Sequence, residues 1–325
     1  MNAEHSTADP EGPSATRQEP IDLTGKVAVV TGSGRGLGLA YATALARAGA
    51  AVVVNDLDAE TAERAATSIT EAGGRAVAEA VAVGTSEAAQ ALVDRAVAAF
   101  GRLDVMVTNA GILRDKVLWK MTDEDFDAVV TTHLRGTFTC ARAAAIRMRE
   151  QGDGGSLIMV GSPAGQRGNF GQTNYAAAKA GIAAMVRTWS MELARAGITV
   201  NAIVPVAATA MTETIPAFAP YIEAMKQGAP LPGFLRKGEG FGTAADCAAL
   251  VPFLASGAAR SVTGQCIGIG GDKLALWSHP HETAVAYADG GWSPEAIAAS
   301  WATSVGREPQ TTGIPAPVIP GGGAA

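Results

Sequence analysis

The alternation of two kinds of segment limits what this chain can fold into more than any other feature of its sequence. Short apolar runs bounded by turn residues alternate with longer Ala-rich amphipathic runs from residue 26 onward. The first kind has the length and composition of buried strands, and the second has the periodicity of helices. Strands that alternate with helices form repeated strand–helix–strand units, so we expect an α/β fold with a parallel sheet covered on both faces.

The individual elements are predicted from the same pattern. Strands are expected at residues 26–31, 51–55, 75–83, 105–108, 156–160, 199–203 and 265–268. Helices are expected at residues 37–48, 59–71, 87–100, 123–150, 174–196 and 244–254, of which 123–150 is long enough to contain a break. A chain of 325 residues with 48% hydrophobic content can bury one such core, and it does not require a second domain.

Two segments do not follow the alternation. Residues 209–240 carry apolar side chains between prolines, and we expect a lid over an apolar ligand, with a pair of packed helices as the alternative. Residues 272–325 hold three of the five tryptophans, so we expect an ordered C-terminal extension whose last part, from about residue 306, is flexible. Residues 1–20 are polar and are expected to be a disordered tail, which leaves 21–271 as the main domain.

Composition limits the expected partners and the compartment. The net charge is -6 and Lys and Arg form no cluster, so we expect a small-molecule partner rather than nucleic acid or a membrane. The three cysteines, Cys140, Cys247 and Cys266, are far apart, so we expect neither a disulfide framework nor a metal site. This cysteine usage and an N-terminus without a signal-peptide pattern indicate the cytoplasm.

One segment contains three groups that suit proton transfer. Tyr175 and Lys179 lie four residues apart in an Ala-rich predicted helix, so their side chains leave the same face. A positive charge beside a phenol favours its ionised form, which makes Tyr175 a candidate general acid and base and Lys179 the group that tunes it. Ser162 is a candidate donor to a substrate oxygen. Because this Tyr and Lys spacing also occurs on ordinary surface helices, the remaining motifs decide.

A glycine-rich loop, TGSGRGLG, joins the first predicted strand to the first predicted helix. Gly32, Gly36 and Gly38 allow a tight turn and close approach of a pyrophosphate to the free N–H groups of the helix. Asp56 follows the second predicted strand, where a carboxylate can bind the ribose hydroxyls of an adenosine and would repel a 2′-phosphate. NAD is therefore favoured over NADP, although the guanidinium of Arg35 could reach a 2′-phosphate.

Taken together, these motifs resemble the short-chain dehydrogenase/reductase family. TGSGRGLG, a later NAG, Ser162, the Tyr175 and Lys179 pair and NAIVP occur in the order and spacing of that family, over roughly residues 23–271. The resemblance implies a Rossmann fold with a doubly wound parallel sheet of about seven strands, a nicotinamide cofactor and a homotetramer or homodimer. It also implies that Tyr175 transfers a proton, Lys179 holds the nicotinamide ribose and lowers the pKa of Tyr175, and Ser162 orients the substrate oxygen.

The resemblance implies cofactor contacts residue by residue. The expected contacts are Gly32, Ser33, Arg35, Gly36, Leu37, Gly38, Asp56, Val83, Asn109, Ala110, Gly111, Tyr175, Lys179, Pro205 and Thr209. His133 stands where the family often has an Asn of the proton relay, so it is a candidate for that relay or only a helix residue near a packed centre. Val83 lacks the neighbouring Asp that commonly binds the adenine, and Val206 replaces the usual Gly after Pro205.

Within the family, several functions remain open for this chain. GSGRGLG, GILRDK and DGGWSPEAI resemble the (3R)-hydroxyacyl-CoA dehydrogenase part of multifunctional enzymes and actinobacterial relatives similar to 17β-hydroxysteroid dehydrogenases. This favours an oxidoreductase that transfers a hydride between NAD(H) and a bulky apolar secondary alcohol or ketone, such as a (3R)-3-hydroxyacyl-CoA or a steroid. An NADPH-dependent 3-oxoacyl-carrier-protein reductase and a non-catalytic nucleotide-binding homologue are the alternatives.

Overall fold

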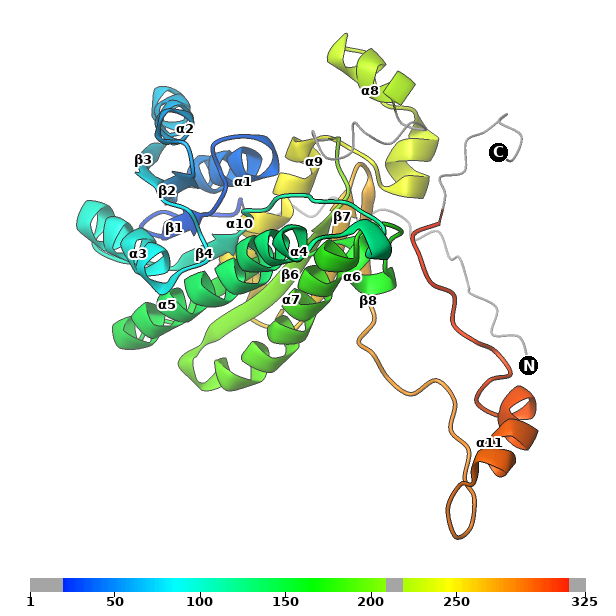
Figure 1. The fold of residues 1–325 in the computed structure, drawn as a ribbon. Coiled ribbons are helices and arrows are strands. Elements are labelled where there is room, and N and C mark those ends of the chain that lie inside the picture. Colours follow the sequence, from blue (N-terminus) through cyan, green and yellow to red (C-terminus); the bar gives the residue numbers. More distant parts are fainter. Residues whose placement is uncertain (1–19, 209–218, 316–325) are drawn as a thin grey trace.

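An eight-stranded sheet between two layers of helices forms the body of the protein (Figure 1). The computed structural model describes residues 20–208 and 219–315. The strands are β1 (Val27–Val30), β2 (Ala51–Asp56), β3 (Arg75–Ala80), β4 (Val105–Thr108), β5 (Gly155–Val160), β6 (Ile198–Pro205), β7 (Cys266–Gly270) and β8 (Lys273–Trp277). Their order is β3-β2-β1-β4-β5-β6-β7-β8, and all are parallel to their neighbours except β8, which is antiparallel to β7. The doubly wound parallel sheet expected from the sequence is confirmed, and β8 was not predicted.

Helices cover both faces of the sheet. They are α1 (Gly36–Arg47), α2 (Ala59–Glu71), α3 (Ser86–Phe100), α4 (Asp123–Val130), α5 (Gly136–Gln151), α6 (Pro163–Arg167), α7 (Thr173–Glu192), α8 (Ala219–Lys226), α9 (Ala244–Ala248), α10 (Leu250–Ala255) and α11 (Pro294–Ser300). Successive strand residues point to opposite faces. Val52 and Val54 therefore join the apolar cluster under α1, α2, α9 and α10, while Val53 joins the cluster under α3, α5 and α7.

This topology determines where a ligand can bind. Strand order runs outward in both directions from the neighbouring strands β1 and β4, so the connections after these two strands diverge to opposite faces. In open α/β sheets, ligands bind in the crevice at the carboxyl ends of the strands at such a switch point. The loops after β1 and β4 carry the glycine-rich motif and the NAG motif.

Two predicted helices are interrupted. The segment expected as one helix at 123–150 contains a π-helical turn, Thr131–Arg135, between α4 and α5. The segment expected at 244–254 divides into α9 and α10 at Ala249. Pro252 explains the second break, because proline has no N–H to donate to residue 248 and its ring crowds that carbonyl.

The described part of the segment expected as a lid forms α8 and a π-helical turn, Phe234–Glu239. Residues 209–218 lie outside the described residues. The apolar side chains Ile222, Leu235 and Phe241 make a small cluster of their own. Arg236 joins this segment to the rest of the chain, since its Nη2 lies 3.2 Å from Asp246 Oδ1 and 2.7 Å from Asp272 Oδ1.

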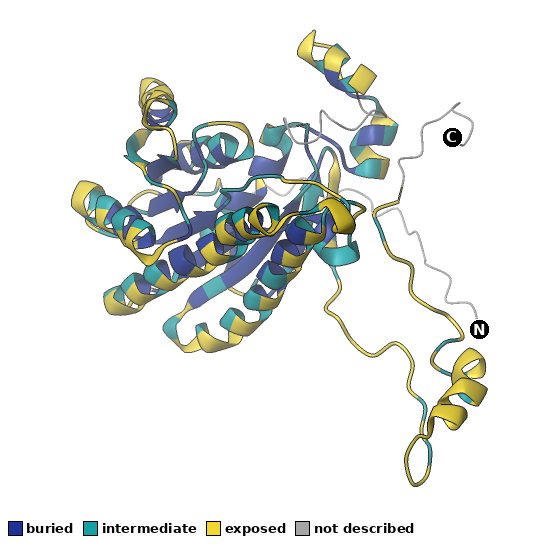
Figure 2. Cartoon of the chain, in the orientation of Figure 1, coloured by how far each residue is buried: buried dark blue, intermediate teal, exposed yellow. Residues whose placement is uncertain are grey.

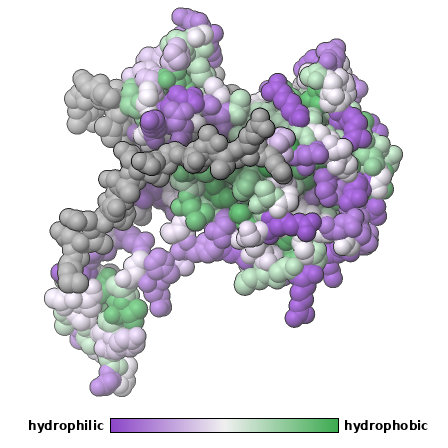
Figure 3. Space-filling model, turned by 180° about the vertical axis from the view of Figure 1, so that it is seen from behind, coloured by the Kyte–Doolittle hydropathy of each residue, from purple (hydrophilic) through white to green (hydrophobic). Residues whose placement is uncertain are grey.

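The C-terminal extension leaves the body after β8, and we call residues 278–310 the arm. Figure 1 shows the arm running away from the sheet, with α11 at its far end. Every residue of the arm is exposed or half-buried, as Figure 2 shows. Apolar side chains gather on the arm (Figure 3), where Trp292, Ile297, Trp301 and Val305 line a hollow of about 260 Å³.

The chain returns from the arm to the body at α6. Arg167 Nε donates a hydrogen bond to the carbonyl oxygen of Gly313 at 2.8 Å, and Arg167 Nη2 donates to Thr311 Oγ1 at 3.1 Å. The backbone N–H of Gly313 donates to the carbonyl oxygen of Arg167 at 2.8 Å. The extension is thus attached at β8 and at Arg167, and at the start of the arm His279 Nε2 lies 2.9 Å from the carbonyl oxygen of Gly264. The rest of the arm projects from the body.

Candidate active site

The loop after β1 is closely packed against its surroundings. A Cβ atom on Gly38 would lie 2.2 Å from the carbonyl oxygen of Gly32, and a Cβ on Gly32, where φ is +60°, would lie 2.7 Å from Ala110 Cα. Neither position can accept a side chain without a shift of the backbone. Gly36 has a φ of +59° and open space beside it. Arg35 is the N-cap of α1 but makes no side-chain cap, so the first N–H groups of α1 are available to an anion.

Ser33 and Leu37 serve the fold of this loop. Ser33 Oγ is buried, donates to the carbonyl oxygen of Val30 at 2.6 Å and accepts from the N–H of Asn55 at 3.1 Å. Leu37 packs against the apolar cluster under α1. The Ser33 hydroxyl therefore joins β1 to the end of β2, and the backbone N–H of Ser33 strengthens this link by donating to the carbonyl oxygen of Asn55 at 2.7 Å.

Asp56 ends β2 and lies against the glycine-rich loop. A Cβ on Gly34 would lie 2.6 Å from Asp56 Oδ2. Asp56 Oδ1 accepts a hydrogen bond from the N–H of Asp58 at 3.3 Å. The carboxylate is thus held beside the loop that follows β1, where a ribose bound with its phosphates at α1 would extend.

Asn109 and Thr31 join the loops after β4 and β1. Asn109 Nδ2 donates to the carbonyl oxygens of Thr31 and Gly32 at 3.0 and 2.9 Å. Thr31 Oγ1 in turn accepts from the N–H groups of Asn109 and Ala110 at 2.9 and 3.0 Å. The side chain of Asn109 therefore sets the shape of the crevice, and Thr31 is a contributor that the sequence analysis did not single out.

Ser162, Tyr175 and Lys179 come together at the carboxyl end of β5. Ser162 follows β5 directly and is the N-cap of α6, where its Oγ accepts from the N–H of Ala164 at 3.2 Å. Tyr175 and Lys179 lie one turn apart on α7, and Lys179 Nζ is 5.5 Å from the centroid of the Tyr175 ring. A Cβ on Gly165 would lie 2.6 Å from Lys179 Cβ, so this glycine allows α6 to pack against α7.

The ammonium group of Lys179 is buried. The residue is 3% exposed, and Nζ donates to the carbonyl oxygen of Val160 at 2.5 Å. Burial lowers the pKa of Lys179 from 10.5 to about 7. The charged form loses most of its hydration at this position and gains one neutral acceptor among the described residues.

The pKa of Tyr175 is raised in the structure, whereas the sequence analysis expected it to be lowered. Burial raises the pKa of Tyr175, hydrogen bonding with Ser162 acts in the opposite direction, and the charge of Asp115 raises it further. The expectation that Lys179 lowers this pKa assumed a lysine that is charged whenever the phenol titrates. With its own pKa lowered to about 7, Lys179 is already neutral when Tyr175 begins to lose its proton.

His133 lies in the π-helical turn and is 2% exposed. Its ring is 5.1 Å from the Tyr175 ring, centroid to centroid, in an edge-on arrangement. His133 Nε2 lies 3.0 Å from the N–H nitrogen and 2.8 Å from the carbonyl oxygen of Ile112, and Nδ1 has no hydrogen-bond partner among the described residues. Burial, followed by the charge of Lys179, lowers the pKa of His133 to about 3, so the ring is neutral at neutral pH.

The remaining predicted contacts surround the same crevice. A Cβ on Gly136 would lie 3.1 Å from Val83 Cγ2, so the segment after β3 lies beside the turn that holds His133. Pro205 ends β6, and the larger Val206 that follows it packs against the apolar cluster around Phe241. Thr209 lies outside the described residues.

The whole arrangement fits a dinucleotide. Uncapped N–H groups at α1 suit its phosphates, and the Asp56 carboxylate suits a ribose. Gly111 connects this part to the catalytic side chains, because a Cβ there would lie 2.2 Å from His133 Cε1. The loop after β4 thus runs from the dinucleotide crevice to the ring of His133, which lies edge-on to the Tyr175 ring.

Comparison with known proteins identifies the family. A family model described as short chain dehydrogenase matches residues 26–219, more than half of the chain. The chain belongs to the short-chain dehydrogenase family. This short-chain dehydrogenase is also similar to a solved structure of a short chain dehydrogenase from Mycobacterium avium, with a TM-score of 0.77 and 33% identity, over 91% of this chain and 99% of that one.

Relatives of this short-chain dehydrogenase include named enzymes. It is 42% identical to hydroxyacyl-CoA dehydrogenase ChsB1 of Mycobacterium tuberculosis, over 89% of this chain and 92% of that protein. It is 43% identical to peroxisomal multifunctional enzyme type 2 of Mus musculus, over 60% of this chain and 27% of that enzyme. It is 38% identical to 3-oxoacyl-(acyl-carrier-protein) reductase FabG of Thermotoga maritima, over 77% of this chain and 98% of that protein. The resemblance read from the sequence is confirmed at the level of the family and of these relatives.

Two side chains near Tyr175 were missed in the sequence analysis of this short-chain dehydrogenase. Asn174 is completely buried next to Tyr175, and Asp115 is close enough for its charge to act on the Tyr175 pKa. Asp115 stands in the quoted motif GILRDK, and Asn174 directly precedes Tyr175. An Asn in the first turn of a helix was a usable signal for Asn174, because that residue type often pairs with backbone groups there.

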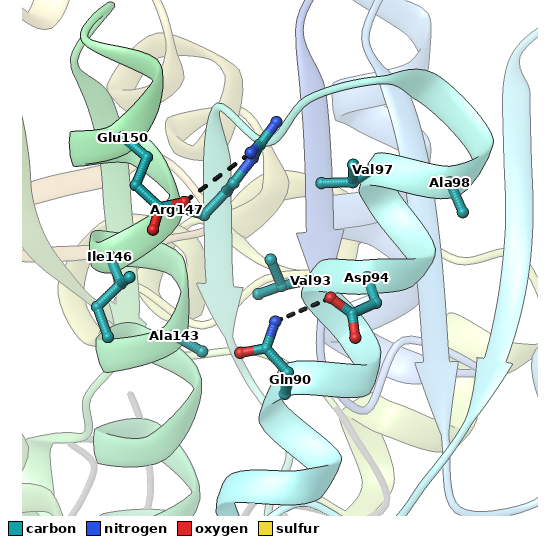
Figure 4. A pocket seen from close by; sticks show the side chains of 9 residues that line it. All are labelled: Gln90, Val93, Asp94, Val97, Ala98, Ala143, Ile146, Arg147 and Glu150. Carbon is teal, nitrogen blue, oxygen red and sulfur yellow. Dashed lines mark hydrogen bonds and ion pairs between the residues drawn. The ribbon is translucent and has the colours of Figure 1, made fainter.

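The outer face of the helices on this short-chain dehydrogenase also carries a hollow. A surface hollow of about 350 Å³ lies between α3 and α5 (Figure 4), where Gln90 pairs with Asp94 and Arg147 with Glu150. These polar side chains pair with one another on the outer face of the helices. Within residues 20–208 and 219–315, His, Cys, Asp and Glu side chains form no group of three that could hold a metal ion. No helix in those ranges is long and apolar enough to cross a membrane.

Proposed function

We propose that this short-chain dehydrogenase transfers a hydride between NAD(H) and a bulky apolar secondary alcohol or ketone, with a (3R)-3-hydroxyacyl-CoA as the first candidate and a steroid as the second. The observation that carries the proposal is the placement of Ser162, Tyr175 and Lys179 beside a crevice that fits a dinucleotide. The name of the Mycobacterium tuberculosis relative, a hydroxyacyl-CoA dehydrogenase, supports the thioester class.

The side chains of this site divide the proton chemistry among them. Ser162 Oγ donates a hydrogen bond to the substrate oxygen and orients it, and Tyr175 Oη takes or returns the proton of that oxygen. Lys179, whose Nζ lies 5.5 Å from the centroid of the Tyr175 ring, would hold the ribose of the nicotinamide. A nicotinamide cofactor would supply the hydride acceptor or donor, held by the loop after β1, Asp56 and the loop after β4.

Asp56 supports NAD as the cofactor. Its carboxylate lies against Gly34, where it would repel a 2′-phosphate. Arg35, at the exposed N-cap of α1, is the feature that favours NADP. Asp56→Ala is expected to lower the ratio of kcat/KM with NAD to kcat/KM with NADP. An unchanged ratio would show that Arg35, rather than Asp56, sets the preference.

A 3-oxoacyl-carrier-protein reductase that uses NADPH is the second candidate function. It is favoured by Arg35 and by the similarity to the Thermotoga maritima reductase over nearly the whole length of that protein. The two candidates differ in cofactor and in the carrier of the acyl group. Activity with NADPH and an acyl-carrier-protein substrate that exceeds activity with NADH and a CoA thioester would support this second function and overturn the first.

A panel of substrates tests the proposed function. A (3R)-3-hydroxyacyl-CoA, a 17-hydroxysteroid and a small cyclic alcohol are each assayed with NAD and with NADP. We expect the highest kcat/KM with the thioester and NAD, and absence of activity on any CoA ester would contradict the thioester assignment. Tyr175→Phe should remove turnover, and full turnover in that variant would show that another group is the acid and base. Absence of turnover by the wild type on every substrate of the panel would favour the non-catalytic homologue.

A proton relay through His133 would use Nδ1. Nε2 is already paired with the backbone of Ile112, and Nδ1 is buried without a partner among the described residues. His133→Phe keeps a flat ring against Tyr175 but removes both nitrogens. A lower kcat per folded molecule in this variant would support the relay. A variant that is less stable but keeps the wild-type kcat per folded molecule would leave His133 with the structural role alone.

We also propose a homodimer or homotetramer in the cytoplasm. Large apolar side chains are exposed on α5 and α7, among them Phe138, Ile146 and Met191, as expected for surfaces between subunits. The three cysteines are unpaired and buried, which suits a reducing compartment. Light scattering after size-exclusion chromatography measures the mass, and a monomer at all concentrations would contradict the oligomer.

A further inference from the structure

Asn174 is buried at the start of α7 and uses its whole side-chain amide. The residue is 0% exposed. Its Oδ1 accepts a hydrogen bond from the backbone N–H of Tyr175 at 2.8 Å, and its Nδ2 donates to the carbonyl oxygens of Arg114 and Asp125, both at 3.1 Å. Both donor protons and the acceptor oxygen are therefore paired, as a buried amide requires. One side chain thus links the backbone of Tyr175 to the loop after β4 and to α4.

The first turn of α7 needs such a link. The first N–H groups of a helix have no partner inside the helix, and Tyr175 is the third residue of α7. Gln172, the N-cap residue, makes no side-chain cap. Asn174 Oδ1 therefore supplies the acceptor that the backbone N–H of Tyr175 would otherwise lack. Tyr175 is also the residue whose hydroxyl must be correctly placed for proton transfer.

The segments that Asn174 links to Tyr175 are also joined to each other. The N–H of Lys116 donates to the carbonyl oxygen of Gly171 at 2.8 Å, and Gln172 Nε2 donates to Asp115 Oδ2 at 2.7 Å. Lys116 Nζ forms an ion pair with Asp125 Oδ2 at 2.6 Å. Asn174 is the buried centre of this set of contacts, and the other members are partly or fully exposed.

We propose that Asn174 is a positioning residue for Tyr175, which keeps the phenol in place by fixing the first turn of α7 to the loop after β4 and to α4. The Asp115 carboxylate belongs to the same set of contacts, through its hydrogen bond with Gln172, the N-cap residue of α7. The proposal rests on the proposed function, in which Tyr175 transfers a proton. It assigns to Asn174 no contact with the substrate or the cofactor.

Two titratable side chains lie against the Tyr175 ring, Lys179 and His133, and a third group, Asp115, acts on Tyr175 through its charge. Lys179 comes from α7, His133 from the π-helical turn and Asp115 from the loop after β4. After burial, which is the larger cause, the charge of Asp115 raises the pKa of Tyr175. Since Gln172 fixes the Asp115 carboxylate, the segment that Asn174 anchors also carries a charge that affects proton transfer.

The kinetics of Asn174→Ala test the proposal, with a (3R)-3-hydroxyacyl-CoA and NAD as substrates. We expect kcat to fall by about 100-fold while KM changes little, because a shift of about 1 Å in a reacting group costs that much. The matched control is Asn201→Ala in β6. Asn201 is 1% exposed and likewise pairs with backbone groups, donating to Val262 O at 2.7 Å and accepting from Gln265 N at 3.1 Å.

Both variants lose a buried amide, so the folded fraction of each must be known. Circular dichroism measures the folded fraction of each variant, and kcat is compared per folded molecule. If the two variants keep the same kcat, the positioning role is overturned. Tyr175→Phe separates this outcome from a failure of the proposed function. An inactive Tyr175→Phe with equal kcat in the two Asn variants rejects positioning alone, whereas a fully active Tyr175→Phe rejects the function on which it rests.

Asp115→Asn gives a second test in a variant expected to fold, because Asp115 is exposed and Asn keeps an oxygen that can accept from Gln172. Loss of the negative charge should move the limb of the kcat–pH profile that reports Tyr175 toward lower pH. Asp289→Asn, on the arm, removes an equal charge far from the site and should leave the profile unchanged. A profile that does not move in Asp115→Asn would overturn the role of Asp115.

Discussion

Replacement of Lys179 by Met is expected to stabilise the protein near neutral pH, measured without added cofactor, while it removes activity. The Lys179 ammonium is almost fully buried, and Nζ has one acceptor among the described residues, the Val160 carbonyl oxygen. Burial lowers the pKa of Lys179 from 10.5 to about 7. Because the unfolded chain keeps the ordinary value, it binds this proton more tightly than the folded protein does, so stability increases with pH between the two values.

The size of the effect follows from the interval between those two pKa values. At about 1.4 kcal/mol per pH unit, the protonated amine costs the fold about 5 kcal/mol at low pH and about 4 kcal/mol at pH 7. Loss of the hydrogen bond to Val160 lowers the free energy of unfolding of the variant by about 1 kcal/mol. We therefore expect Lys179→Met to raise the free energy of unfolding by about 3 kcal/mol at pH 7.

Urea denaturation of both proteins between about pH 6 and pH 10.5 measures this difference. It should be largest at and below pH 7 and should shrink as the pH approaches 10.5, where the amine of the unfolded chain is also neutral and only the loss of about 1 kcal/mol for the hydrogen bond to Val160 remains. Lys120→Met, which removes an exposed lysine, should leave the pH dependence of stability as it is in the wild type. A difference that stays constant across this range, or a variant less stable than the wild type at pH 7, would refute the reasoning.

Two further substitutions test the fold around the site. Asp104→Asn should lower the free energy of unfolding by about 2 to 4 kcal/mol, because the buried carboxylate accepts from Val27 N and bidentately from Arg102. Burial alone would raise the pKa of Asp104, but these bonds lower it, so in urea denaturation the deficit should be fully present above about pH 4 and should shrink below it, as the pH falls through the lowered pKa of the folded protein. Gly111→Ala should cost about 1 to 3 kcal/mol, since its Cβ would lie 2.2 Å from His133 Cε1. A melting temperature equal to the wild type in Gly111→Ala would show that this loop can move away from the ring.

The strands and helices that local pattern determines were predictable. The helix expected at 59–71 has those bounds in the structure, where Asp58 caps it by accepting from Thr61 N, and the strand expected at 105–108 is β4. The break inside 123–150 was not predictable in its form, because the π-helical turn contains His133, whose ring pairs with the backbone of Ile112. β8 was missed because a five-residue strand is recognised through its pairing with β7, which the sequence of β8 alone does not contain.

The candidate site was predictable in its residue types and less so in its energetics. Spacing and motifs were enough to name Ser162, Tyr175 and Lys179 as neighbours. The direction of the Tyr175 pKa was not available from spacing, because burial, which depends on the whole fold, outweighs the contribution of a nearby amine that is itself buried. Asn174 shows the same limit, since its partners are carbonyl groups of Arg114 and Asp125, far from it in the sequence.

The attachment of the extension at both of its ends has a consequence for the integrity of the chain. A single cleavage within the arm would leave all eight strands, Tyr175 and Lys179 in one fragment, because β8 precedes the arm. The short second fragment would then be retained by hydrogen bonds between Arg167 and residues 311–313. Arg167 is the last residue of α6, the five-residue helix that Ser162 caps. Dissociation of the fragment would therefore remove the hydrogen bonds of Arg167 at one end of α6, while the Ser162 hydroxyl lies at the other end.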